Sequence, residues 1–155
     1  MTSINPSRIG SSALRPILMV EDNEMDLDLC AQAFKEHAIA NPLVACRDGE
    51  EALQYIDAHP HPADPGLPII VLLDLRLPKV DGIDVLRYAR QHPVWQQVPF
   101  IVLTTSRQNS DVAAAYRLGV NSYIVKPVDF VEFTEVAKRI EMYWVLTNVP
   151  PFIDP

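Results

Sequence analysis

The chain has 155 residues, a length that suits a single domain with a sizeable hydrophobic core. Apolar residues make up 48% of the chain, so a globular domain is expected rather than a disordered one. The formal net charge of −7 disfavours a general nucleic-acid-binding surface, because such surfaces are usually basic.

The cysteines and the N-terminus indicate the compartment. Cys30 and Cys46 stand outside any CxxC motif, and a reduced pair in the cytoplasm is the simpler interpretation. No segment reaches the length of a membrane span, and the N-terminus lacks the long apolar region of a signal peptide. We therefore expect a cytoplasmic protein with no membrane partner, whose residues 1–14 form an N-terminal tail.

Five short apolar segments predict β-strands. Three of them, Ile17–Val20, Ile69–Leu73 and Phe100–Thr104, do not alternate between apolar and polar residues. Such runs are typical of strands that are buried on both faces of a parallel sheet. The segments around Val44 and Ile124 are the other two candidate strands.

Helical spacing of apolar residues appears between the strands. The predicted stripes are Leu27, Ala31, Phe34 and Ala38; Ala52, Leu53 and Ile56; Val85, Leu86 and Ala89; and Val112, Ala115 and Tyr116. Gly119 is a plausible end of the fourth helix, and Asp129 can cap a fifth, with Glu132 reaching back. The alternation predicts an α/β domain over residues 15–147, with right-handed crossovers and helices on both faces of a parallel sheet.

A proline-rich loop precedes the third predicted strand. Residues 58–68 contain four prolines, which exclude a regular helix or a central strand. His59 and His61 lie in this loop and are potential metal ligands. Because no cysteine or metal-binding motif accompanies them, a solvated loop is the simpler interpretation.

Polar residues follow four of the predicted strands. Glu21 and Asp22 follow the first strand, Asp74 ends the third, Thr104 ends the fourth, and Lys126 follows the fifth. Ligands of open α/β sheets bind at the carboxyl ends of the strands. Three carboxylates, a hydroxyl and an ammonium are therefore expected to meet at one edge of the sheet.

This combination points to phosphoryl chemistry. Clustered carboxylates repel each other, and Mg²⁺, which prefers oxygen ligands, relieves that repulsion. Asp74 can then act as a nucleophile that forms an aspartyl phosphate, while Lys126 and Thr104 stabilise the phosphoryl oxygens. Each residue taken alone is explained as a helix cap, a strand end or a surface lysine, so the prediction depends on their joint placement.

The segments "VEDN", "LLDLRLPKVDG", "VLTTS" and "YIVKP" resemble the motifs of the receiver domain of two-component response regulators. The resemblance extends from about Pro16 to the last predicted helix. It implies a flavodoxin-like, doubly wound sheet of five parallel strands in the order 2-1-3-4-5, with five helices. It also implies that Asp74 accepts phosphate from a histidine kinase, and that the protein catalyses only its own aspartyl phosphorylation and dephosphorylation.

The same resemblance assigns further roles. The backbone carbonyl of Arg76 would be a metal ligand beside Asp22 and Asp74, with Glu21 bound directly or through water. Thr104 and Tyr123 would form the switch pair, and the peptide bond before Pro127 would be cis. The chain also departs from the family, because Arg76 stands where small regulators of this type often have asparagine.

A narrower resemblance concerns the proline-rich loop and the ending "EMYWVLTNVPPF". Both resemble the small single-domain response regulators that partner phytochrome-type histidine kinases. Residues 142–146 are apolar all round, which suggests an interface. We expect a homodimer through the last helix and the extension 148–155, the alternative being that the tail folds back on its own domain.

Other functions remain as alternatives. A haloacid dehalogenase-type phosphatase would carry a second acid where Arg76 stands, and a nucleotide-binding domain would carry a glycine-rich turn that this chain lacks. A receiver-like interaction module that is not phosphorylated is the main alternative, although such modules usually lack the aspartate, threonine or lysine. The identity of the kinase, any downstream phosphotransfer or target protein, and the signal stay open.

Overall fold

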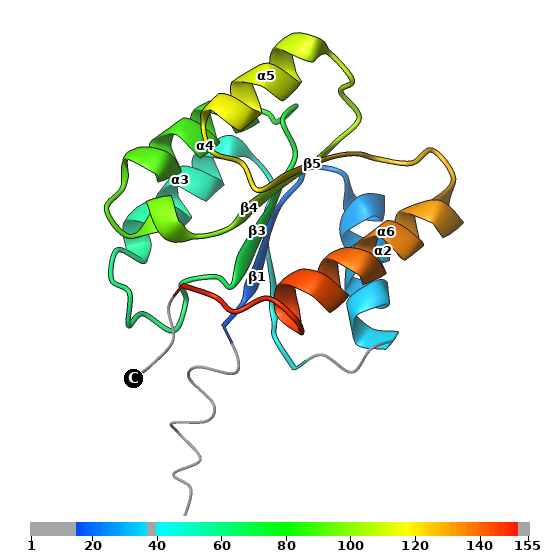
Figure 1. The fold of residues 1–155 in the computed structure, drawn as a ribbon, viewed down its shortest axis with the longest axis horizontal. Coiled ribbons are helices and arrows are strands. Elements are labelled where there is room, and N and C mark those ends of the chain that lie inside the picture. Colours follow the sequence, from blue (N-terminus) through cyan, green and yellow to red (C-terminus); the bar gives the residue numbers. More distant parts are fainter. Residues whose placement is uncertain (1–14, 37–39, 152–155) are drawn as a thin grey trace, which may run out of the picture.

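The computed structural model describes residues 15–36 and 40–151 (Figure 1). The predicted N-terminal tail, Ala38 of the first stripe and the last four residues of the C-terminal extension lie outside the described residues. Five strands form one parallel sheet in the order β2-β1-β3-β4-β5, which confirms the predicted fold class. The strands are β1 (Ile17–Val20), β2 (Leu43–Cys46), β3 (Ile70–Leu73), β4 (Phe100–Thr104) and β5 (Ser122–Val125).

Within the described part of the chain, five α-helices cover the two faces of the sheet. They are α2 (Glu24–Glu36), α3 (Gly49–Ala58), α4 (Gly82–Gln91), α5 (Asn109–Arg117) and α6 (Phe130–Ile140). A short 3-10 helix, η1 (Trp95–Gln97), precedes β4, and one π-helical segment, η2 (Glu141–Val145), continues α6. Helices α2 and α6 pack on one face, and α3, α4 and α5 lie on the other (Figure 1).

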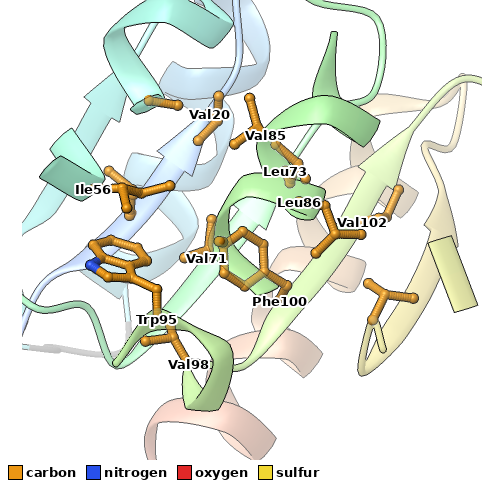
Figure 2. Packing of buried hydrophobic residues seen from close by; sticks show 14 of the residues in the cluster. Val20, Ile56, Val71, Leu73, Val85, Leu86, Trp95, Val98, Phe100 and Val102 are labelled. Atoms are coloured by element: carbon orange, nitrogen blue, oxygen red, sulfur yellow. The ribbon is translucent and has the colours of Figure 1, made fainter. Parts of the chain in front are cut away.

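The core has two parts because side chains of a strand alternate between its faces. Leu18 and Val20 of β1 join the cluster under α3, α4 and α5, whereas Ile17 and Met19 join the cluster under α2 and α6. Figure 2 shows the first cluster, in which Phe100 lies near the middle of the group and Trp95 lies at its margin, near Ile56 and Val98. Strands β1, β3 and β4 are thus buried on both faces, as their unbroken apolar runs predict.

The helix ends follow the sequence signals in most cases. The Asp129 side chain accepts a hydrogen bond from the backbone N–H of Val131, which confirms the predicted cap of α6. Gly119, directly after the C-cap residue of α5, adopts a φ of 75°, a conformation that glycine reaches without strain. The stripe predicted for α2 is partly wrong, because its buried face is formed by Leu27, Cys30, Ala33 and Phe34, and Ala31 is only partly buried.

The proline-rich loop is held by side chains rather than by regular structure. The guanidinium of Arg15 donates hydrogen bonds to the carbonyl oxygens of Pro62, at 2.9 Å, and Leu67, at 3.3 Å. The His59 ring stacks on Tyr55, and the His59 carbonyl accepts a hydrogen bond from the indole of Trp95. These contacts give His59 a structural role. Among the described helices, none combines the length and apolar character that a membrane crossing requires.

Candidate functional site

The strand register brings the first two acids together. Val20 of β1 pairs with Leu73 of β3, so the residues that follow them, Glu21 and Asp74, emerge side by side at the carboxyl edge of the sheet. Ligand oxygens of Glu21, Asp22 and Asp74 lie within 4.8 Å of one another. Glu21 and Asp74 are buried, and Asp22 faces solvent. An all-oxygen set with one open side fits Mg²⁺, which prefers oxygen ligands and retains several waters.

Lys126 reaches the same place from the end of β5. Its Nζ lies 2.5 Å from Oε1 of Glu21, 2.9 Å from Oδ2 of Asp26 and 2.9 Å from Oδ2 of Asp74. Only 5% of the Lys126 side chain is exposed, so one enclosed ammonium faces three carboxylates and offsets only part of their charge. Asp26 was missed from the sequence, because an acid in the first turn of a helix is ordinarily explained by the helix dipole. Its position in the first turn of the helix that directly follows Glu21 and Asp22 is the signal that was available.

The pKa values reflect this crowding. Burial raises the pKa of Glu21 to about 7; the charge of Asp74 acts in the same direction, and Lys126 opposes both. Burial by itself lowers the pKa of Lys126, but the hydrogen bonds to Glu21 and Asp26 together with the charge of Asp74 outweigh it, so the pKa of Lys126 is raised. The lysine therefore stays charged at neutral pH, whereas Glu21 is poised to take up a proton when no metal is bound.

Thr104 and Tyr123 meet at Ser106, in the loop between β4 and α5. Thr104 is fully buried, and its Oγ1 accepts a hydrogen bond of 3.4 Å from the backbone N–H of Ser106. The Tyr123 hydroxyl donates to the Ser106 carbonyl at 2.9 Å. The residues expected to form a switch pair thus share one neighbour, Ser106, which the sequence analysis did not assign.

Arg76 contacts the site through its backbone and another loop through its side chain. The Arg76 N–H donates to Oδ1 of Asp74 at 3.3 Å. The guanidinium forms an ion pair with Asp111 in the first turn of α5. Sequence reasoning did not identify Asp111, because nothing in the spacing of residues 76 and 111 indicates that the two side chains meet.

The expectation of a cis bond before Pro127 is wrong for this structure, since no described peptide bond is cis. The trans isomer is the intrinsically favoured form, by about 0.5–1 kcal/mol for a bond that precedes proline. With the trans bond, the Lys126 N–H already donates to the Thr104 carbonyl at 2.7 Å and Nζ reaches the acids. The site is therefore assembled without the cis isomer.

The model of the response regulator receiver domain matches residues 17–138 of the chain. The chain belongs to the response regulator receiver family. Phosphorylation and Mg²⁺ binding are typical of this family. A receiver domain of a response regulator is not a classical enzyme.

Three relatives of this receiver domain share most of its length. A probable methanogenesis regulatory protein, FilR2 of Methanothrix harundinacea, is 39% identical over 87% of this chain and 86% of its own. The response regulator Rcp1 of Synechocystis sp. is 35% identical over 91% of this chain and 96% of its own. The crystal structure of the phosphorylated cyanobacterial phytochrome response regulator RcpA superposes with a TM-score of 0.83, at 35% identity, over 90% of this chain and 99% of that one. The receiver is thus homologous to phytochrome response regulators.

Proposed function

We propose that Asp74 is the phosphoacceptor and that a histidine kinase is the phosphodonor. The observation that carries the proposal is the position of the Asp74 carboxylate. Lys126 holds its Oδ2 at 2.9 Å, while Oδ1 faces the Arg76 N–H at 3.3 Å. A buried carboxylate that is fixed through one oxygen is oriented for attack through the other, which is the geometry that nucleophilic catalysis requires.

The transfer exchanges one bond to phosphorus for another. A carboxylate oxygen of Asp74 attacks the phosphorus, the phosphorus–nitrogen bond to the kinase histidine breaks, and the electron pair stays on the imidazole, which takes up a proton. The ammonium of Lys126 provides positive charge for the phosphoryl oxygens, and Thr104 provides a hydroxyl donor. The product is an aspartyl phosphate on the side chain of Asp74.

The metal would be held by Asp22, Asp74 and the backbone carbonyl of Arg76, with Glu21 as a direct or water-mediated ligand. The close approach of the three acids supports this assignment. When bound, Mg²⁺ supplies charge neutralisation for the phosphoryl oxygens. The protein's own part is to present buried acids whose mutual repulsion Lys126 only partly offsets.

Thr104 and Tyr123 would report the phosphorylated state. Thr104 would turn its hydroxyl toward the phosphoryl group and give up its contact with the Ser106 N–H. Tyr123, whose hydroxyl is anchored to the Ser106 carbonyl, would then move with this loop. The shared contact with Ser106 supports a coupled movement of the two side chains.

The kinase would approach over the exposed apolar residues that border the site. Met25 at the start of α2 and Val128 and Phe130 in the loop after β5 are exposed large hydrophobics. The Asp26–Lys126 ion pair joins these two segments, so the exposed residues belong to one rim of the site. The similarity to Rcp1 and RcpA supports a kinase of the phytochrome type.

The protein would form a homodimer, with an interface made by α6, η2 and the extension from residue 148. Met142, Tyr143 and Leu146 are more than half exposed, and Val149 in the extension is 71% exposed. A groove of about 310 Å³ beside them is lined by Ile124, Val136, Arg139, Ile140, Tyr143 and Trp144. Exposed apolar surface beside a groove supports an interface, with residues 15–147 as the receiver domain and the extension as its arm.

Incubation with acetyl phosphate and Mg²⁺, followed by mass spectrometry, tests the phosphoacceptor. The wild-type protein should gain one labile phosphoryl group, and Asp74→Asn should gain none. Asp84→Asn is the matched control, because Asp84 is an exposed acid of α4 that pairs with Arg87. Undiminished labelling of Asp74→Asn would overturn the proposal, and no labelling of the wild type would favour the non-phosphorylated interaction module.

A further inference from the structure

The ion pair between Arg76 and Asp111 joins the loop after β3 to the start of α5. Arg76 lies two residues after Asp74, and Asp111 lies in the first turn of α5. The Arg76 side chain is 50% exposed and the Asp111 side chain 15%, so the arginine is accessible to solvent whereas the carboxylate is largely enclosed. The pair therefore links the phosphoryl-accepting loop directly to α5.

Helix α5 depends on Asp111 at its start. Gln108 occupies the N-cap, and its side chain makes no capping hydrogen bond. Asp111, three residues later, accepts a hydrogen bond from the Ser106 hydroxyl at 2.5 Å through Oδ2, the oxygen that also receives Arg76. The same carboxylate oxygen thus ties the first turn to the preceding loop and to Arg76.

A phosphoryl group on Asp74 would compete for Arg76. Lys126 occupies Oδ2 of Asp74, and Oδ1 is the oxygen beside the Arg76 backbone. A phosphoryl group carries more negative charge than a carboxylate and offers three acceptor oxygens. Guanidinium groups bind such oxygens in pairs, so the phosphoryl group is the stronger partner.

We propose that the Arg76–Asp111 ion pair is a latch of the resting state that the phosphoryl group on Asp74 opens. Arg76 exchanges Asp111 for the phosphoryl oxygens, and the first turn of α5 loses one of its two side-chain ties. The opening of the latch acts in addition to the Thr104–Tyr123 pair. Both affect Ser106, since Thr104 and Tyr123 contact its backbone and Asp111 accepts a hydrogen bond from its hydroxyl. The inference rests on the proposed role of Asp74 as phosphoacceptor.

A double-mutant cycle with the phosphoryl analogue beryllofluoride tests the latch. Affinity is measured by calorimetry at a fixed, saturating Mg²⁺ concentration for the wild type, Arg76→Gln, Asp111→Asn and the double variant. Asp111→Asn should tighten binding about two- to fivefold, the range of an exposed ion pair, because Arg76 is released. In the Arg76→Gln background, the Asp111→Asn change should have no effect on affinity.

Glu36→Gln is the control for charge. It removes one negative charge from an ion pair with Lys138 on α6 and should leave the affinity unchanged. If Asp111→Asn changed the affinity for beryllofluoride equally with Arg76 present and with Arg76→Gln, the effect would come from the lost charge alone, and the latch would be overturned. Weaker binding by Asp111→Asn would overturn it as well.

Hydrogen exchange provides a second measurement that does not depend on affinity. Beryllofluoride should speed amide exchange at residues 109–112 of the wild type, and Asp111→Asn should show the faster exchange without the analogue. Slower exchange there on binding would contradict the latch. If the wild type does not bind the analogue, or Asp74→Asn binds it equally, the phosphoacceptor assignment fails together with the latch. If binding requires Asp74 and the cycle is additive, the latch alone fails.

Discussion

At the scale of single residues, the site is organised around one buried ammonium. Lys126 contacts Glu21, Asp26 and Asp74, each from a different segment of the chain. Removing one partner from a buried ion pair leaves the other charges without compensation, which is far more unfavourable than losing a surface pair. The same ammonium also repels any cation that binds the acids. Lys126 therefore affects stability and metal affinity in opposite directions.

Lys126→Ala should lower the free energy of unfolding by about 3–5 kcal/mol in the absence of metal, the range for breaking a buried ion pair. It should also bind Mg²⁺ more tightly than the wild type, because three acids remain and the competing charge is gone. Urea unfolding in a chelator and calorimetry measure the two effects. Lys138→Ala, which removes a surface pair with Glu36, should change stability by less than about 1 kcal/mol. Weaker Mg²⁺ binding by Lys126→Ala would contradict this account.

The two thiols should be unreactive in the folded protein. Cys30 and Cys46 are buried and unpaired with each other, and burial raises the pKa of each thiol to about 12. The unfolded chain releases these protons above about pH 9, whereas the folded protein holds them until about pH 12, so stability is lost as the pH rises between about 9 and 12. At pH 8 a thiol reagent should modify neither cysteine until denaturant is added. Rapid modification without denaturant would show that these sites open.

At the scale of elements, the start of α4 packs closely against the loop that carries Asp74. Gly82, the first residue of α4, donates its N–H to the Leu75 carbonyl at 2.9 Å. A Cβ atom at this position would lie 2.2 Å from the Asp74 carbonyl oxygen and 2.6 Å from Cα of Leu75. These are backbone atoms that cannot turn aside, so only glycine lets α4 begin this close to Asp74.

Gly82→Ala should therefore lower stability by about 1–3 kcal/mol, the range for overpacking, and slow phosphorylation by acetyl phosphate. The reason is that the loop carrying Asp74 must shift to admit the methyl group. Asp84→Ala, at an exposed position of the same helix, is the control for changes in helix stability. Thermal unfolding and the labelling rate measure the two effects, and a Gly82→Ala protein that matched the wild type in both would show that the loop adapts freely.

At the scale of the whole molecule, the sheet separates the face on which the proposed latch would act from the face that carries the proposed dimer interface. Helices α3, α4 and α5 cover one face, and α5 begins beside the Arg76–Asp111 pair. Helices α2 and α6 cover the other face (Figure 1). Helix α6 continues into η2, where the Met142 and Tyr143 side chains are exposed. The proposed site lies at the edge that both faces share, which places it in contact with each.

Light scattering on the full chain and on a variant that ends at Thr147 should give a dimer for the first and a weaker dimer or a monomer for the second. The variant loses the whole extension 148–155, including the exposed Val149, while Met142, Tyr143 and Leu146 remain. Tyr116→Ser, on exposed α5, is the control for loss of an exposed aromatic elsewhere and should remain a dimer. A full chain that is monomeric would contradict the interface. If the full chain and the shortened variant formed equally stable dimers, the interface would belong to α6 and η2 alone.

Much of this architecture follows from local sequence. The unbroken apolar runs predict buried parallel strands, since such runs cannot have a solvated face, and a parallel sheet brings its carboxyl ends to one edge. The approach of Glu21, Asp22, Asp74 and Lys126 follows from that geometry alone. The first helix was less predictable, because Ala31 and Cys30 are both small and only the packing against β1 and β3 decides which is buried.

Only the tertiary structure decided which long side chains meet. Asp26 reaches Lys126, and Arg76 reaches Asp111 across 35 residues, through rotamers and loop paths that no sequence spacing encodes. The isomer before Pro127 belongs to the same class, since both isomers of such a bond are close in energy and the surroundings select one. Sequence periodicity determines which backbone ends lie together, because hydrogen-bonded strands have a fixed geometry. The partners of flexible charged side chains depend on distances in space, and these exist only once the chain has folded.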